Sequence, residues 1–165
     1  MRSLRIGEIV LEPQVAAHAA ELFTVLDDPD LYGFVDDKGP ASETALRERL
    51  ARLESRQSPD GLEQWLNWVV RNATGAVTGY VQATVRAHGE AEIAYVLGRR
   101  FWRQGIAFAA CSAMLEELAG AYGVTRAVAT LDPDNIASLA LLRKLGFRFE
   151  SEDIAAHEVR HVRDL

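Results

Sequence analysis

The chain has 165 residues, 48% of them hydrophobic and 25% charged, and this balance excludes intrinsic disorder as the main state. Its formal net charge of −6 argues against a dedicated nucleic-acid-binding domain, because such domains are usually basic. The single cysteine, Cys111, excludes an internal disulfide framework and a cysteine-based zinc cluster and fits a reducing compartment. We therefore expect a cytoplasmic protein. The lack of a signal-like apolar segment or a bilayer-length apolar run argues against secretion and against a membrane partner.

The N-terminal third predicts one strand and two helices. Residues Leu4–Leu11 are rich in leucine, isoleucine and valine and predict a short strand, after which Pro13 is predicted to open a helix. The segment Asp27–Gly39 combines aspartates with glycine and proline and predicts a loop. Ser42 is a candidate N-cap for the second helix, which we expect to end at the turn Ser58–Gly61.

The middle of the chain has the period of β-strands. Gln64–Arg71, Ala76–Arg86 and Ala91–Leu97 are separated by turn signals at Asn72–Gly75 and His88–Gly89. They predict three consecutive antiparallel strands. In the second strand, alternation places five residues on one face: Val77, Gly79, Val81, Ala83 and Val85.

The last third alternates between helical and β patterns. In chain order these are a helix over Ile106–Tyr122, a strand over Val124–Thr130, a helix over Asn135–Leu145, and strands over Phe147–Ser151 and His157–Val162. The first of these helices is apolar except for a strip formed by Ser112, Glu116 and Glu117. Because strand–helix–strand crossovers are right-handed, the strands that flank it are expected to be parallel. The chain is thus predicted to be a single α/β domain over residues 1–165, with a mixed, twisted sheet flanked by helices on both faces.

The turn Arg99–Ala107 is the first candidate site. It joins a strand to a helix start, where backbone N–H groups lack partners and the helix dipole is positive. Gly105 and Ala107 lack bulk, and three arginines add positive charge. The functional interpretation of this pattern is a pyrophosphate site, but for the turn taken alone a helix start with a solvated basic turn is the simpler explanation.

The segment Asn135–Phe147 is the second candidate. Asn135 and Ser138 lie three residues apart near the start of a helix, where Asn135 is also a natural N-cap. Together with Glu92–Leu97 and Trp102–Ala107, this segment resembles the GCN5-related N-acetyltransferase (GNAT) family in order and spacing. The resemblance runs from about Trp68 to Phe149 and is closest to the branch that contains the ribosomal-protein N-terminal acetyltransferases.

The resemblance implies a donor and a set of contacts. The co-substrate would be acetyl-CoA, with the backbone of Val96 and Leu97 pairing with the pantetheine arm. Asn135 and Ser138 would approach the thioester end, and Lys144 would either reach the phosphates or remain solvated. The implied pyrophosphate cradle consists of Arg103, Gln104, Gly105, Ile106 and Ala107.

The chain also departs from the family pattern. Trp102 stands where the family often has glutamine or arginine, and Arg103 where this branch often has glycine. Leu142 occupies a position where many members carry a tyrosine that acts as general acid. Leucine cannot donate a proton, so either Ser138 assists the departing thiolate or the thiolate leaves without an acid.

Direct acetyl transfer requires a neutral amine, and Glu92 is the candidate base. Its neighbours on the same strand face, Ala94 and Val96, are apolar, and a carboxylate there suggests a function. The alternatives are a solvated carboxylate at the strand edge and deprotonation by solvent. No histidine lies at a spacing that compels a metal, so no metal is expected.

The acceptor is expected to be a primary amine. The Asp27–Gly39 loop contains five aspartates: Asp27, Asp28, Asp30, Asp36 and Asp37. Their negative charge predicts attraction of a cationic acceptor, although a solvated acidic loop is the simpler explanation. The alternative to an enzyme is a non-catalytic acyl-CoA-binding regulatory module with the same fold. A homodimer is common among relatives, and the oligomeric state stays open.

Overall fold

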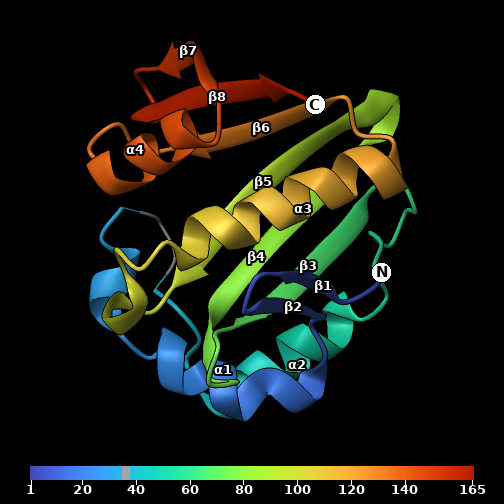
Figure 1. Ribbon diagram of the computed structural model, residues 1–165, viewed down its shortest axis with the longest axis vertical. Coiled ribbons are helices and arrows are strands. Elements are labelled where there is room, and N and C mark those ends of the chain that lie inside the picture. Colours follow the sequence, from blue (N-terminus) through green and yellow to red (C-terminus); the bar gives the residue numbers. More distant parts are fainter. Residues whose placement is uncertain (35–37) are drawn as a thin grey trace.

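One eight-stranded sheet, in the order β1-β2-β3-β4-β5-β6-β8-β7, organises the molecule (Figure 1). The structure is a computed structural model that describes residues 1–34 and 38–165. The strands are β1 (Leu4–Ile6), β2 (Ile9–Pro13), β3 (Gln64–Arg71), β4 (Val77–Val85), β5 (Glu90–Leu97), β6 (Arg126–Leu131), β7 (Arg148–Asp153) and β8 (Glu158–Asp164). The pair β5–β6 is parallel and the other neighbouring pairs are antiparallel, which confirms the predicted mixed sheet.

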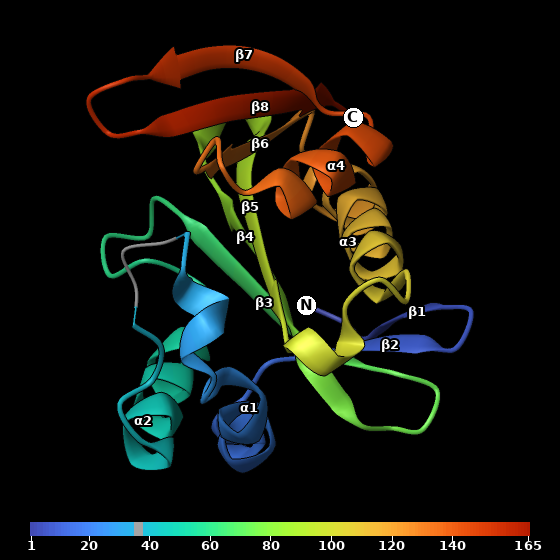
Figure 2. The same ribbon diagram turned by 90° about the vertical axis from the view of Figure 1, so that its left-hand side faces the viewer.

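Helices cover the sheet on both faces. They are α1 (Ala19–Leu26), α2 (Glu43–Leu53), α3 (Ile106–Tyr122) and α4 (Ile136–Lys144), with short 3-10 turns η1 (Ala16–His18), η2 (Pro29–Tyr32), η3 (Ala87–Gly89) and η4 (Arg99–Phe101). Figure 2 shows α1 and α2 on one side of the sheet and α3 and α4 on the other. The larger core lies under α3 and includes Trp68 and Met114, both fully buried, whereas Leu22 and Val69 belong to the core under α1 and α2.

The first strand and first helix differ from the prediction. Residues Leu4–Leu11 form a hairpin rather than one strand, because Gly7 takes φ +56° between β1 and β2. Pro13 ends β2 opposite Trp68 instead of opening a helix. The missing N–H of proline is tolerated at a strand end, and the chain turns helical only three residues later, at Ala16.

A one-residue irregularity in β4 overturns the predicted alternation. Val70 is paired with Gly79 and Arg71 with Val77, so Thr78 is an extra residue on β4. The shift moves Val77 to the core under α1 and α2, while Val81 and Val85 stay under α3. Because side chains alternate with period two, one inserted residue sends Val77 to the opposite face.

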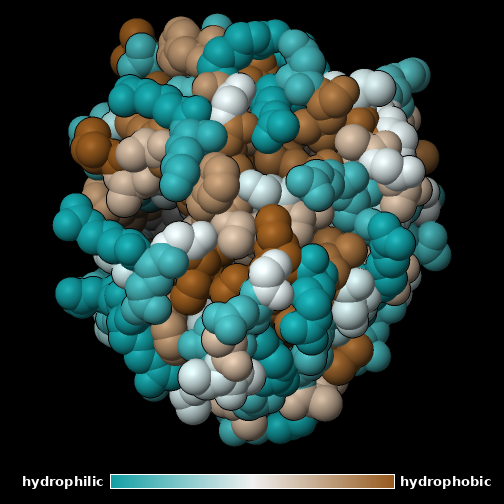
Figure 3. All heavy atoms as spheres, viewed as in Figure 1, coloured by the Kyte–Doolittle hydropathy of each residue, from teal (hydrophilic) through white to brown (hydrophobic). Residues whose placement is uncertain are grey.

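The polar strip predicted on α3 is partly buried. Glu117 has a side-chain exposure of only 4% and accepts two bonds from Arg2 Nε, at 3.1 and 3.0 Å, and one from Arg2 Nη2 at 2.6 Å. Figure 3 shows polar and apolar side chains intermixed over the α3 side of the molecule. Among the described residues, no helix combines the length and the hydropathy that crossing a membrane would require.

Candidate acyl-transfer site

Strands β5 and β6 separate after a short parallel contact. β5 is paired with β4 from Ala91 to Leu97, but with β6 only at Glu90, Ala91 and Glu92. Figure 1 shows the two strands diverging toward the end of the molecule at which α3 begins. The C-terminal half of β5 therefore has one edge without a strand partner among the described residues.

The alternating direction of the backbone hydrogen bonds along β5 determines which residues face this open edge. Arg86 N donates to Glu90 O at 2.8 Å, and Gly98 N donates to Thr78 O at 2.9 Å, so even-numbered residues of β5 bond to β4. The backbone groups of Tyr95 and Leu97 accordingly point away from β4, toward the gap. The backbone of Val96, for which pairing with the pantetheine arm is predicted, is directed to β4, and the backbone of Tyr95 faces the gap instead.

The Leu97 carbonyl on this edge is already occupied. The indole Nε1 of Trp102 donates to it at 2.6 Å, although Trp102 is 49% exposed. Trp102 thereby ties the end of β5 to the turn before α3. This contact gives a structural reason for the tryptophan at a position where the resembling family often has a polar residue.

The start of α3 presents unbonded backbone donors. Gly105 is the N-cap, with φ +78° and no side-chain cap, and the first turn contains no acidic residue. Arg103 also has a positive φ of 59°, and a Cβ at Gly105 would meet nothing within 4 Å. The N–H groups of the first turn, including those of Ile106 and Ala107, are therefore available to an anion at the positive end of the helix dipole.

The arginines of this turn are not equally available. Arg99 forms an ion pair with Asp30, and the Arg100 guanidinium lies 4.7 Å from the centre of the Phe101 ring. Arg103 is exposed and has no partner among the described residues. Gln104 donates its side-chain amide to the Arg100 carbonyl at 2.9 Å, which stabilises the turn itself.

The start of α4 lies across the gap from β5. Asn135 Oδ1 accepts the backbone N–H of Ser138 at 3.1 Å, which confirms that Asn135 is the N-cap of α4. Its other predicted role, an approach to the thioester end of the donor, stays a prediction. The Tyr95 hydroxyl donates to the Ser138 carbonyl over 3.4 Å and links β5 to α4. Burial raises the pKa of Tyr95 to about 12, so its proton is retained at neutral pH. The Ser138 hydroxyl has no partner among the described residues.

The end of α4 brings a positive charge to the start of α3. Lys144 Nζ lies 4.3 Å from the centre of the Phe108 ring, in the first turn of α3. The tertiary structure thus packs Lys144 of α4 against the first turn of α3, the helix whose N-terminus is the candidate phosphate site. Leu142 is 1% exposed and belongs to the core, so it takes no part in proton transfer.

Glu92 lies on the opposite face of β5, next to an arginine. Its Oε2 accepts from Arg86 Nη2 at 2.9 Å, and Arg86 Nε also donates to Glu63 at 3.0 Å. Glu92 Oε1 is without a hydrogen bond from the described part of the chain. Glu92 is therefore a partly exposed carboxylate with one oxygen free of hydrogen bonds from the described residues. Of its two apolar neighbours on this face, Val96 packs against the core under α1 and α2, whereas Ala94 is exposed.

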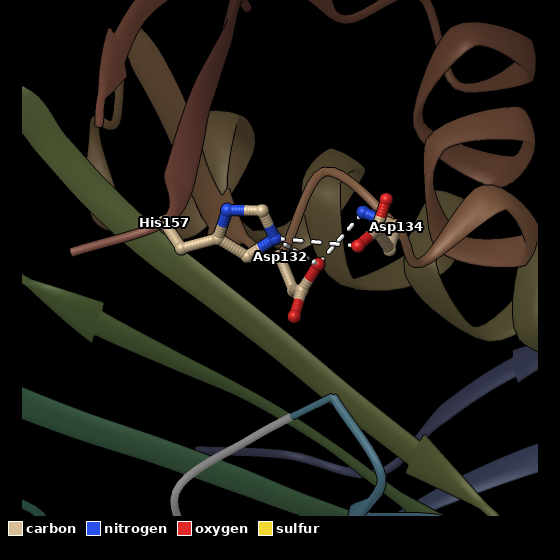
Figure 4. Close-up of side chains that lie close together, drawn as sticks. All are labelled: Asp132, Asp134 and His157. Atoms are coloured by element: carbon tan, nitrogen blue, oxygen red, sulfur yellow. Dashed lines mark hydrogen bonds and ion pairs between the residues drawn. The ribbon is translucent and has the colours of Figure 1, made fainter. Parts of the chain in front are cut away.

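Three further groups come together that the sequence did not connect. His157 Nε2 lies 3.3 Å from Asp134 Oδ2 and 3.6 Å from Asp132 Oδ1 (Figure 4). Imidazole and carboxylates of this kind can ligate a divalent cation, and they also form an ordinary ion pair. No local signal links them, because His157 comes from the β7–β8 turn and the aspartates from the turn before α4. The expectation of no metal remains a prediction.

The predicted acidic loop is only partly described. Asp30 pairs with Arg99, and Asp28 accepts the Asp30 N–H at 3.1 Å as the N-cap of η2. Asp36 and Asp37 lie outside the described residues. Two of the three described aspartates, Asp28 and Asp30, thus have local structural partners, which weakens the argument for an acceptor field from this loop.

The comparisons with known proteins assign a family to this mixed sheet, in which two strands diverge beside an uncapped helix N-terminus. The family model described as an acetyltransferase (GNAT) domain matches residues 8–148. The chain belongs to the GNAT family and is an N-acetyltransferase. No sequence in the curated set is significantly similar to it.

Solved structures of ribosomal-protein acetyltransferases have the same fold. RimJ of Mycobacterium smegmatis, in complex with CoA-disulfide, has a TM-score of 0.85 at 22% identity, over 98% of this chain and 85% of that chain. RimL, a ribosomal L7/L12 alpha-N-protein acetyltransferase in complex with coenzyme A, has a TM-score of 0.84 at 19% identity, over 97% and 96%. The ribosomal-protein-S5-alanine acetyltransferase from Vibrio fischeri has a TM-score of 0.81 at 18% identity, over 98% and 96%.

Proposed function

We propose that this enzyme transfers an acetyl group from acetyl-CoA directly to a primary amine, and that the amine is the α-amine of a polypeptide. The observation that carries the proposal is the open edge of β5 next to the uncapped start of α3. An extended pantetheine arm can pair with the backbone of Tyr95 and with the N–H of Leu97, whose carbonyl is taken by Trp102, as an added strand would. The pyrophosphate then meets the donors of Gly105, Ile106 and Ala107.

Other residues hold the two ends of the donor. Arg103 and Lys144 supply positive charge near the phosphates, while Gln104 keeps the turn in shape. Asn135 fixes the first turn of α4, and the Ser138 hydroxyl is the candidate donor to the departing thiolate. A hydrogen bond to sulfur there stabilises charge that develops only in the transition state.

The acidity of the acceptor itself favours an α-amine. Arg86 bonds to one oxygen of Glu92, which leaves Oε1 as the atom that would take the amine proton. An α-amine, with a pKa near 8, is about one-fifth neutral at pH 7.4, whereas a lysine amine is only about 0.1% neutral. The α-amine needs far less help from a base. The ribosomal-protein enzymes of the same fold, whose names specify a protein N-terminus, support this choice.

Calorimetry with acetyl-CoA tests the donor site. Gly105→Glu places a carboxylate at the proposed pyrophosphate, and we expect binding to weaken beyond detection, since several charge-assisted hydrogen bonds of about 1.5–3 kcal/mol each would be lost. Gly105→Ala controls for the positive φ, and Gly120→Glu adds the same charge on α3 where a Cβ meets nothing within 4 Å. Equal binding by the wild type and Gly105→Glu would refute the site.

Turnover separates the enzyme from a non-catalytic binding module. We expect free thiol to appear when acetyl-CoA is mixed with peptides that have a free α-amine, together with a mass increase of one acetyl group on the peptide. Peptides with a blocked N-terminus are the matched control. Tight binding of acetyl-CoA without acetyl transfer to any amine would instead identify a binding module.

A further inference from the structure

The open edge of β5 offers four backbone groups to a donor arm. The outward-facing residues are Tyr95 and Leu97, so these groups are two N–H donors and two carbonyl acceptors. The pantetheine arm of an acyl-CoA contains two amide bonds, and it therefore also has two donors and two acceptors. An arm that lies along β5 as an added strand has a possible partner for each of its amide groups.

One of these four groups is already used within the protein. The Leu97 carbonyl accepts a hydrogen bond from the indole Nε1 of Trp102 at 2.6 Å. In the described ranges 1–34 and 38–165, no side chain bonds to the backbone of Tyr95 or to the N–H of Leu97. While the indole stays in place, one amide N–H of the arm is therefore left without its acceptor on β5.

Burial in the core does not account for the position of Trp102. The residue is 49% exposed, although tryptophan is one of the largest apolar residues. The turn before α3 places it instead, because the Trp102 N–H donates to the Arg99 carbonyl at 3.0 Å as the C-cap of η4. Arg103 follows with φ +59°, a conformation that residues other than glycine seldom adopt. The local backbone thus holds the indole against the edge of β5.

We propose that Trp102 limits the affinity of the enzyme for its donor by withholding the Leu97 carbonyl from the pantetheine arm. This inference rests on the proposed function, because it takes the arm to lie along β5. The product CoA carries the same arm as acetyl-CoA, so the weaker hold also speeds release of the product. Trp102 is a positioning residue in this role, since it acts through the carbonyl that it occupies and not on the acetyl group.

Trp102→Phe tests the proposal, because it keeps an aromatic ring and removes the N–H that occupies the carbonyl. We expect the dissociation constants of acetyl-CoA and CoA, measured by calorimetry, to fall about fivefold, as one additional neutral hydrogen bond would produce. Most of the gain should appear as slower dissociation of CoA in a stopped-flow displacement experiment.

A purely structural role for the indole predicts the opposite sign. If Trp102 served only to tie β5 to the turn before α3, its loss would loosen the turn and weaken donor binding. Weaker binding by Trp102→Phe would therefore overturn the proposal. Unchanged binding would overturn it as well, because it would mean that the Leu97 oxygen accepts both the indole and the arm through its two lone pairs.

The two halves of the donor locate the effect. S-acetylpantetheine has the arm without the nucleotide, and the phosphorylated ADP half of CoA has the nucleotide without the arm. In NMR titrations we expect Trp102→Phe to bind S-acetylpantetheine about fivefold more tightly than the wild type and the nucleotide half equally well. A change confined to the nucleotide half would show that the indole acts on the base or the phosphates, and would overturn the proposal.

Two further variants separate the loss of the N–H from a change in folding. Replacement of Trp102 by benzothienylalanine, an isostere with sulfur in place of the N–H, should tighten binding as Trp102→Phe does. Trp65→Phe removes an indole N–H that donates to Glu63 Oε2 at 3.0 Å and should leave donor affinity within twofold. Equal tightening in Trp65→Phe would refute a specific effect of Trp102.

The outcomes also distinguish this proposal from the proposed function. Acetylation of peptides by an enzyme whose donor affinity does not rise in Trp102→Phe would leave the acyltransferase intact and refute the role of Trp102. Failure of the wild type and of Trp102→Phe to bind acetyl-CoA would refute both.

Discussion

The Arg86 guanidinium joins Glu92 to Glu63, with Nη2 at 2.9 Å from Glu92 Oε2 and Nε at 3.0 Å from Glu63 Oε1. Glu92 follows β4 and η3 in the chain, whereas Glu63 precedes β3, so the arginine spans three strands of the sheet. Glu92 is thus held in one orientation beside the point where β5 and β6 separate. The arrangement positions the candidate base and leaves its Oε1 without a hydrogen bond from the described residues.

Glu92→Gln tests the base. The variant keeps the hydrogen bond from Arg86 but cannot accept a proton, and we expect kcat to fall by about 10²–10⁴-fold with little change in acetyl-CoA affinity. The measurement is a pH–rate profile with a peptide acceptor. Glu63→Gln, which alters the other partner of Arg86, is the control and should change kcat less than threefold. A profile that is identical in Glu92→Gln and wild type would show that solvent deprotonates the amine.

Ser138→Ala tests the candidate proton donor. If the hydroxyl stabilises the departing thiolate, turnover should fall more than acetyl-CoA affinity, because that charge develops only in the transition state. Single-turnover rates and calorimetric affinities provide the comparison. A parallel loss in both would identify Ser138 as a binding contact, and full activity would leave the thiolate without an assigned donor.

Asn135→Ala removes the N-cap of α4. We expect a loss of about 1 kcal/mol in the free energy of unfolding, because the Ser138 N–H loses its acceptor. Urea denaturation measures the change, and Asn135→Asp should retain most of the stability, since aspartate caps equally well. No loss in Asn135→Ala would mean that α4 is held by its packing alone.

Gly79→Ala tests the irregularity in β4. Gly79 has φ +149°, and a Cβ there would overlap the Val96 carbonyl. We expect a loss of about 3 kcal/mol in the free energy of unfolding, from backbone strain and a displaced β5. Gly120→Ala is the opposite case, because Gly120 is helical with open space around it, and should stabilise by about 0.5–1 kcal/mol. Equal effects of the two substitutions would contradict the close approach of β4 and β5.

His161 makes stability depend on pH in a defined window. Burial, followed by the charge of Arg143, lowers the pKa of His161 in the folded chain below its unfolded value near 6.5. Below pH 6.5 the unfolded chain binds the proton more readily, so the free energy of unfolding should fall as pH decreases below this point and be unaffected above it. Thermal melts between pH 7.5 and 5 measure the slope.

His161→Gln should flatten this slope between pH 6.5 and 5, whatever its effect on overall stability. His88, exposed in the turn before β5, is the control, and His88→Gln should leave the slope as in the wild type. Carboxyl groups whose pKa is lowered by arginine partners, such as Glu150, contribute only at lower pH. A slope that persists in His161→Gln would exclude this histidine as its source.

The sequence by itself determined the features that depend on neighbours along the chain. The 3.6-residue and two-residue periods specify α2–α4 and β3–β6, because burial of one face repeats with the local geometry of each element. The crossover rule made β5 and β6 parallel before any contact was known. Gly105 marked the start of α3, and Asn135 marked the start of α4.

Only the tertiary structure decided the features that join distant segments. Arg86 with Glu92, Lys144 with Phe108, and His157 with Asp134 all connect different elements, and no local pattern encodes their distances. The extra residue at Thr78 likewise has no local signal, because it satisfies a register between two strands rather than a propensity of one. Asp153 and Glu158 likewise become direct neighbours only when β7 and β8 pair, because their separation of five residues along the chain does not by itself bring them together.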